Sequence, residues 1–270
     1  MLRFAKKQAF RLISTNRASL PVKMLHKAFS FVDAAYNNKG SDFFLNGEAN
    51  LMQRLAQADL RTVFDVGANA GHWSEAALRF WPNCHIHAFE IAPPTADRYR
   101  ACLANEIEKG RVSFNDFGMS DEFAEIEMFY YPGNDELTSH RRRHAEHHAE
   151  RFIGKVSTLN QYCQTNSIDR IDFLKIDIEG HEFKVMRGGS DLLNRHDISC
   201  IQFEYGAFST ESRFFVKDYY EMLNDYWIGK IFPDGVHFSD YDWTMENFQF
   251  CNYVAVQKTR PELRGFLSPR

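Results

Sequence analysis

The feature that most constrains the fold is the stretch from Thr62 to Gly71, which joins a short apolar run to a loop with two glycines. Its β-branched and aromatic residues predict a buried strand, and residues 73–80 are typical of a helix. Gly67 and Gly71 would let the backbone turn sharply and approach a ligand closely. The sequence therefore predicts a strand, a tight loop and a helix, the opening unit of a nucleotide-cofactor site. The alternative is the same unit without a cofactor.

The spacing within this loop indicates which cofactor it holds. A dinucleotide site has glycines spaced as G-x-G-x-x-G, so that a pyrophosphate lies on the helix N-terminus. Here Asn69 replaces the second glycine and Asp65 precedes the loop. A carboxylate facing the loop would repel a pyrophosphate and attract a cationic amino-acid group. We therefore expect S-adenosylmethionine rather than NAD, bound by Asp65, Gly67, Asn69 and Gly71.

Two further strands are predicted to end in cofactor contacts. Residues 85–90 alternate as a strand that ends in Glu90, about 20 residues after the glycines, where a carboxylate can accept hydrogen bonds from both ribose hydroxyls. A third strand at 111–114 precedes Asp116 and Phe117, which we expect at the adenine amino group and ring. The alternatives are a surface glutamate and ordinary turn chemistry.

Charged residues are concentrated in a later strand that is otherwise apolar. Residues 171–178 read as a buried parallel strand, yet Lys175 and Asp177 lie within it. Burying charges is costly unless they are paired, and an acid–base cluster beside the cofactor would explain them. A fifth strand at 198–204 ends in Glu204. Asp177 and Glu204 should therefore meet, either to hold a divalent cation such as magnesium or to provide a general base.

The first 32 residues contain no acidic residue and seven lysines and arginines, interleaved with apolar residues. This pattern predicts an amphipathic helix, either packed on the catalytic domain or lying on an anionic membrane. An organelle presequence would look similar.

A second unusual segment, from Gly133 to Gly154, is rich in histidine and arginine. Three hypotheses fit it. It is a solvated charged helix, a lid whose arginines hold substrate phosphates, or a transition-metal site if a helix aligns its histidines. Those histidines are His140, His144, His147 and His148.

Length and composition predict the domain organisation, the partners and the compartment of the protein. The 270 residues suit one domain with appendages: an N-terminal helical arm over 1–58, a catalytic domain over 59–260 and a tail over 261–270. The net charge of −4 argues against a nucleic-acid partner. Five cysteines without a C-x-x-C pair indicate a reducing compartment. No apolar run is long enough to span a membrane, so we expect a cytoplasmic protein, with peripheral contact at the inner face of a membrane as an option.

Taken together, these motifs resemble the FkbM family of S-adenosylmethionine-dependent methyltransferases over roughly residues 62 to 206. The resemblance rests on Asp65 to Gly71, Phe89-Glu90, Gly118 to Asp121, Thr158-Leu159, Leu174 to Gly180 and Gly188. It implies a Rossmann-like α/β fold, with a mostly parallel sheet, helices on both faces and an antiparallel edge strand, which we place at 250–256. It also implies methyl transfer to a hydroxyl of a glycan or secondary metabolite. Ile91 and Asn160 depart from the family pattern, which weakens any transfer of substrate-side roles.

Methyl transfer to an alcohol requires alignment of the oxygen and removal of its proton. We expect Asp177, aided by Glu204 and His181, to supply a base or a metal ion, and Lys175 to pair with a carboxylate in the same group. The acceptor would be a small molecule, a glycan or a glycolipid intermediate. Three alternatives remain: a nucleic-acid methyltransferase, an NAD-dependent reductase or epimerase, and a glycan-binding scaffold with a vestigial pocket. The sequence does not predict an oligomeric state.

Overall fold

The computed structural model describes residues 2–142 and 148–269. The chain forms two compact units, Met1–Ser41 and Asp42–Arg270. This division differs from the predicted arm and tail. Helix α3 (Glu48–Leu55) contacts helix α12 (Pro261–Leu267) within the second unit, because both helices bury leucines in its core.

The first unit consists of helices α1 (Leu2–Thr15) and α2 (Leu20–Tyr36). The predicted single amphipathic helix is thus divided in two, and Pro21 lies in the first turn of α2, where a proline is tolerated. No described side chain of α1 and no side chain of α2 is buried. Within the described residues, none of the helices combines the length and the apolar character needed to cross a bilayer.

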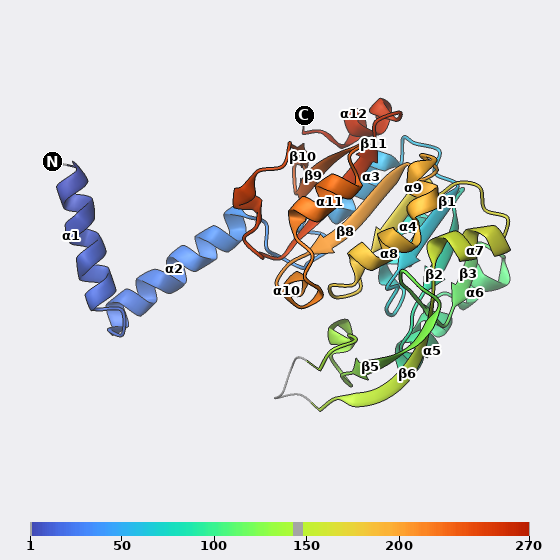
Figure 1. Cartoon of the computed structure of the whole chain (residues 1–270), viewed down its shortest axis with the longest axis horizontal. Coiled ribbons are helices and arrows are strands. Elements are labelled where there is room, and N and C mark those ends of the chain that lie inside the picture. Colours follow the sequence, from blue (N-terminus) through green and yellow to red (C-terminus); the bar gives the residue numbers. More distant parts are fainter. Residues whose placement is uncertain (1, 143–147, 270) are drawn as a thin grey trace. The chain divides into compact units, whose positions relative to one another are not determined.

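The second unit is built on an eight-stranded sheet with the order β3-β2-β1-β7-β8-β11-β9-β10 (Figure 1). The five strands from β3 to β8 are parallel to one another. β10 is antiparallel to β9 and forms one edge, so the predicted fold class is confirmed. The bounds of the strands are β1 Thr62–Val66, β2 His85–Phe89, β3 Val112–Asn115, β7 Phe173–Ile176, β8 Cys200–Tyr205, β9 Tyr226–Phe232, β10 Gly235–Phe238 and β11 Cys251–Gln257.

The position predicted for the strand at 250–256 is wrong. This strand, β11, is not at the edge of the sheet but between β8 and β9, and it is antiparallel to both. Its residues from Tyr253 to Gln257 are all buried, as expected for an interior strand with helices on both faces.

Helices cover both faces of the sheet, and each face has its own apolar core. Along β1, Val63 packs in one core with residues of α3, α4 and α12, whereas Phe64 packs in the other with residues of α7, α8, α9 and α11. Both faces of the sheet are therefore shielded from solvent, which explains the nearly continuous apolar character of the strands. The helices are α4 His72–Phe80, α5 Pro93–Cys102, α6 Ala104–Glu108, α7 Leu159–Thr165, α8 Glu182–Gly188, α9 Ser190–Asn194, α10 Ser209–Ser212 and α11 Val216–Met222.

A second, smaller sheet is formed by β4 (Gly118–Met119), β6 (Glu150–Ser157) and β5 (Ala124–Tyr130), in that order. β5 and β6 form an antiparallel hairpin, which lies below the main sheet in Figure 1. Gly154 of β6 packs against Ile91, since a Cβ atom built on this glycine would lie 2.5 Å from the isoleucine side chain. The hairpin is thus fixed to the segment that follows β2.

The His/Arg-rich segment is not the predicted charged helix in its described parts. It contains a short 3-10 helix, Asp135–Leu137, and the first half of β6. His140 lies in a bend, and the exposed His148 lies within 4.0 Å of Glu150. His144 and His147 lie outside the described residues, so the predicted histidine face stays a hypothesis.

Candidate functional site

The site lies where the order of the strands reverses, between β1 and β7. From β1 the chain continues to β2 and β3 on one side, and from β7 it continues to β8 on the other. In doubly wound sheets, ligands bind beyond the carboxyl ends of the strands at this point. The loops that follow the two strands touch there, because the Asp177 amide donates to the carbonyl of Val66 at 3.0 Å.

The loop after β1 is tight and is held by the end of β2. Gly67 has φ +83°, and a Cβ on it would lie 1.9 Å from the Asp177 carbonyl oxygen, so only glycine fits. Asn69 is also left-handed, with φ +47°, and its amide donates to the Glu90 carboxylate at 3.0 Å. Gly71, with φ +92°, lies against the ring of Tyr99. The predicted loop and Glu90 are thus brought together.

Glu90 is a buried carboxylate with several backbone donors. It is 8% exposed, and it accepts hydrogen bonds from the amides of Asn69 at 3.0 Å and Ala92 at 2.8 Å. Burial raises the pKa of Glu90 to about 7, although these hydrogen bonds oppose the rise. Near neutral pH this carboxyl therefore exists in both protonation states.

Asp65 does not face a ligand in the loop. Its side chain is fully buried. It accepts a hydrogen bond from the Ser74 hydroxyl at 2.7 Å, and the Lys175 ammonium lies 3.3 Å from its other oxygen. Tyr99 in turn donates to Ser74 at 2.9 Å. We expected the charge of Asp65 to select the cofactor. The structure corrects this expectation, because Lys175 neutralises that charge beneath the loop.

Lys175 is the centre of this buried network. Its side chain is 6% exposed, and its ammonium lies 3.3 Å from Asp65 and 3.2 Å from Asp177. Burial alone would lower the pKa of Lys175, but the carboxylates of Asp177, Asp65 and Glu48 outweigh it and raise the pKa. The residue is a permanent cation that links β1 to the end of β7, as the predicted pairing with a carboxylate requires.

Asp177 and Glu204 meet at the carboxyl ends of β7 and β8, as predicted, and share a hydrogen bond. Burial and then the charge of Asp177 raise the pKa of Glu204 well above its usual range. Burial acts to raise the pKa of Asp177 too, but Lys175 outweighs it and lowers that pKa. Glu204 thus holds the shared proton, and Asp177, whose side chain is 46% exposed, is the ionised partner.

This arrangement does not support the predicted divalent cation. Magnesium is usually held by one or two ionised carboxylates together with water in an octahedral shell. At this site Glu204 carries a proton, and an ammonium group already lies 3.2 Å from Asp177. A second cation would have to displace both.

His181 does not join Asp177 as a base. Its Nε2 lies 2.9 Å from the Ser120 hydroxyl, and its ring packs edge-on against His140. Burial lowers the pKa of His181 to about 3. The imidazole is therefore neutral, and the charged groups that act on it are His140, Lys184 and Asp121 rather than Asp177. The structure thus does not place His181 in the predicted group with Asp177.

The two residues after β3 differ in their surroundings. Phe117 packs against Phe89 at the end of β2, with ring centroids 5.7 Å apart, and Glu90 directly follows that strand. Asp116 has a 69% exposed side chain and forms an ion pair with Arg100 at 2.8 Å. Phe117 is thus well placed beside the site, whereas the carboxylate of Asp116 is bound at the surface.

Two glutamates of the site were missed by the sequence analysis. Glu182 accepts hydrogen bonds from the amides of Ile178 at 3.1 Å and Gly180 at 3.0 Å, and burial raises its pKa to about 7. Glu182 closely follows the charged strand in the sequence, and this position could have indicated that it belongs to the site. Glu48 of α3 accepts from Gln202 at 2.6 Å across 154 residues of chain and acts electrostatically on Lys175. No local pattern reveals such a contact.

A cavity of about 800 Å³ lies elsewhere in the second unit. It borders α7, α9 and the residues that precede β7 and β8, so it opens near the amino ends of these strands. Its lining comprises Asn160, Cys163, Gln164, Ser167, Ile168, Asp169, Asp191, Leu192, Arg195 and Asp197. It is not part of the site between the two loops.

Residues 65–228 match the family model described as the methyltransferase FkbM domain. The chain is 30% identical over 153 residues to methyltransferase sdnD of Sordaria araneosa, covering 47% of this chain. It is 26% identical over 148 residues to the 2-O-methyltransferase NoeI of Sinorhizobium fredii, covering 49% of this chain. The chain spans 59% of the length of each of these relatives.

Among solved structures, methyltransferase FkbM from Methylobacillus flagellatus is similar at 16% identity with a TM-score of 0.47. The matched region covers 73% of this chain and 44% of that one.

We predict that Lys175→Met lowers the free energy of unfolding by about 3–5 kcal/mol, because it leaves Asp65 buried without a cation. Urea unfolding followed by circular dichroism measures the loss. The double variant Lys175→Met/Asp65→Asn should recover most of it, since the buried charge is then gone. The exposed Arg79→Met serves as a surface control, with an expected change below about 0.5 kcal/mol. Additive losses in the double variant would contradict the prediction.

Proposed function

Because the chain belongs to the FkbM methyltransferase family, we propose that it uses S-adenosylmethionine to methylate a hydroxyl oxygen. The acceptor would belong to a glycan, a glycolipid intermediate or a secondary metabolite. Oxygen as the acceptor atom is favoured by the similarity to NoeI, which is described as a 2-O-methyltransferase. The observation that carries the proposal is the ionised, half-exposed Asp177 between the two loops at the strand switch point.

The residues at the end of β1 and β2 are suited to the nucleoside part of this cofactor. The Glu90 carboxylate is hydrogen-bonded to the loop and can also accept from a ribose hydroxyl, because a carboxylate accepts up to about four hydrogen bonds. Phe117 offers an apolar ring beside Phe89. Since Lys175 neutralises Asp65, the preference for this cofactor over NAD rests on the family and no longer on charge.

S-adenosylmethionine supplies, when bound, a methyl group that is already electrophilic on its sulfonium sulfur. The protein must therefore align the acceptor oxygen and accept its proton. An acceptor hydroxyl must give up its proton once its oxygen carries the methyl group. The carboxylate of Asp177 then suffices to take it and pass it to solvent. Lys175 keeps Asp177 ionised, and the proton on Glu204 fixes its orientation.

We predict that Asp177→Asn lowers methyl transfer by about 10²–10⁴-fold, the usual contribution of a general base, and leaves cofactor binding intact. The measurement is transfer of labelled methyl from S-adenosylmethionine to a panel of sugar and polyketide acceptors, with calorimetry of cofactor binding in parallel. Asp169→Asn is the matched control, because this carboxylate is exposed and precedes β7 at the opposite end of the strand.

Unchanged turnover in Asp177→Asn would remove this residue from the reaction. An absence of binding heat with S-adenosylmethionine in the wild-type protein would instead favour a scaffold with a vestigial pocket.

We further predict that cofactor affinity depends on pH through Glu90. Its pKa is raised to about 7, and a ribose hydroxyl donates a stronger hydrogen bond to the ionised carboxylate than to the protonated form. The Kd of S-adenosylhomocysteine should therefore fall by up to about tenfold from pH 6 to pH 8 as the carboxyl loses its proton. Calorimetry across this range measures the effect.

Glu90→Gln should abolish this pH dependence. Glu182→Gln is the matched control, because Glu182 has the same raised pKa but contacts the other loop. An equal pH dependence in Glu90→Gln and the wild type would show that another group is responsible.

We also propose that the first unit contacts an anionic membrane surface. Phe4, Phe10, Phe29 and Phe31 are 64–76% exposed on α1 and α2, and the basic residues of these helices have no acidic neighbour before Asp33. Exposed apolar side chains and positive charge together favour a surface of anionic lipid. Such contact would bring the enzyme to a lipid-linked acceptor.

The test is cosedimentation of the full chain with vesicles of phosphatidylcholine, with and without phosphatidylserine. We predict binding to the anionic vesicles only, weakened by salt and by the variant Arg3→Gln/Lys6→Gln/Lys7→Gln/Arg11→Gln. Equal binding to both vesicle types, or none, would contradict the proposal. Self-association in the absence of vesicles would identify a second copy of the chain as the partner.

A further inference from the structure

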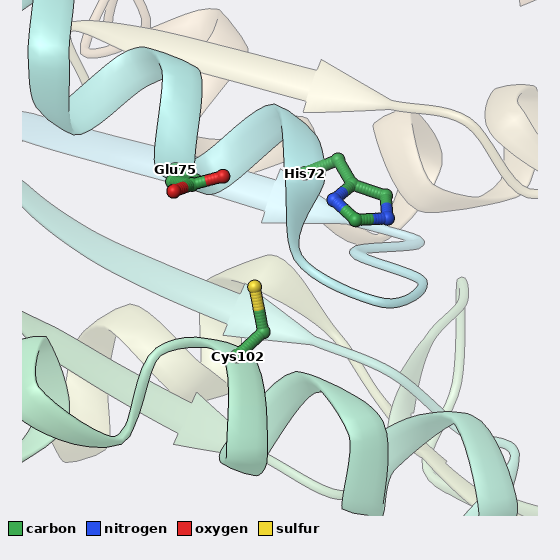
Figure 2. Close-up of side chains that lie close together, drawn as sticks. All are labelled: His72, Glu75 and Cys102. Carbon is green, nitrogen blue, oxygen red and sulfur yellow. The ribbon is translucent and has the colours of Figure 1, made fainter.

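Three side chains of metal-ligand type converge at a place that the methyl-transfer proposal does not use. His72 is the first residue of α4, Glu75 lies one turn further on the same helix, and Cys102 is the last residue of α5. Their ligand atoms all lie within 4.8 Å of one another. Figure 2 shows the sulfur of Cys102 pointing from α5 toward the space between the other two side chains on α4.

We propose that His72, Glu75 and Cys102 form a zinc site that ties α4 to α5. Imidazole nitrogen, carboxylate oxygen and thiolate sulfur are the three protein ligands of zinc, whereas sulfur and nitrogen are poor ligands for magnesium or calcium. His72 and Cys102 are exposed, so water completes a four-coordinate shell.

To bind one zinc ion, the three ligand atoms must move slightly closer together. Ligand atoms around tetrahedral zinc lie about 3.3–3.8 Å apart, given metal–ligand bonds of about 2.0–2.3 Å. The present separations, up to 4.8 Å, must shorten to this range through rotation of the exposed His72 and Cys102 side chains. Glu75 already accepts a hydrogen bond from Arg79 through Oε1 at 2.6 Å. The side chain of Arg79 is 74% exposed and that of Glu75 is 43% exposed, and exposed ion pairs contribute little to the free energy of folding. The carboxylate also has a second oxygen to offer.

Binding at this site involves one proton. Cysteine binds zinc as the thiolate, whereas a free thiol carries its proton at neutral pH in most molecules. Zinc forms its bond to the sulfur as the S–H bond breaks, and the proton passes to the buffer. Zinc affinity should therefore increase with pH.

The position of the cluster gives it a structural consequence for the cofactor loop. His72 directly follows Gly71, the last residue of that loop, and Gly71 lies against Tyr99 of α5. A metal bridge from α4 to α5 would hold these two helices together next to the loop. The zinc site itself does not depend on the proposed methyl transfer.

The experiment uses the untagged full chain and Ellman's reagent, which reports thiols. Cys102 is exposed, whereas Cys84, Cys163, Cys200 and Cys251 are buried, so the fast reaction of the native protein reports Cys102. One equivalent of zinc chloride should slow this reaction by at least about tenfold, and a chelator should restore it. Metal analysis after desalting should give one zinc per chain.

His72→Gln and Glu75→Gln should each weaken the zinc protection of Cys102 by at least about tenfold, the loss that even an outer-shell change causes at a metal site. His237→Gln is the matched control, because His237 is half exposed and pairs with Asp234 on the far hairpin. Two results would overturn the proposal. One is a Cys102 reaction rate that zinc does not change, including the case in which zinc binds the histidine-rich segment instead. The other is protection that persists in both variants.

Discussion

The buried cation of Lys175 is the interaction on which the rest of the site depends. It lies between Asp65 under the first loop and Asp177 at the start of the second, so one ammonium group joins the two strands at the switch point. Removing a charge from water is expensive, and the cost is offset only when each charge has a close partner. This requirement explains why charged residues occur in strands that are otherwise apolar on both faces.

The two loops of the site are held by the same kind of interaction, a buried carboxyl group that accepts hydrogen bonds from backbone amides. Glu90 accepts a backbone amide from the loop after β1, and Glu182 accepts two from the loop after β7. Both carboxyls are buried, and burial raises the pKa of each to about 7. Left-handed residues occur in each loop, at Gly67 and Asn69 in the first and at Glu179 and Gly180 in the second. Buried acceptors stabilise these unusual turns because they satisfy amides that no strand partner reaches.

The sequence predicted the parts of this structure that are encoded by local pattern. The strand, loop and helix around Gly67, and the meeting of Asp177 with Glu204, follow from periodicity and from the common edge of parallel strands. The direction of Asp65 could not be predicted, because it depends on Lys175, which is distant in sequence. His181 lies apart from Asp177 because its ring contacts Ser120 and His140, and both of these residues are distant from it in sequence. The interior place of β11 depends on which strands it pairs with, and Glu48 acts on the site from a helix that precedes the family motifs.

The packing of Gly154 against Ile91 restricts which side chains fit at either position. The hairpin and the segment after β2 occupy adjoining space, so a side chain at one position must be matched by a smaller one at the other. A side chain larger than glycine at position 154 would displace Ile91, and with it the segment that directly follows Glu90. The hairpin and this side of the site are therefore mechanically linked.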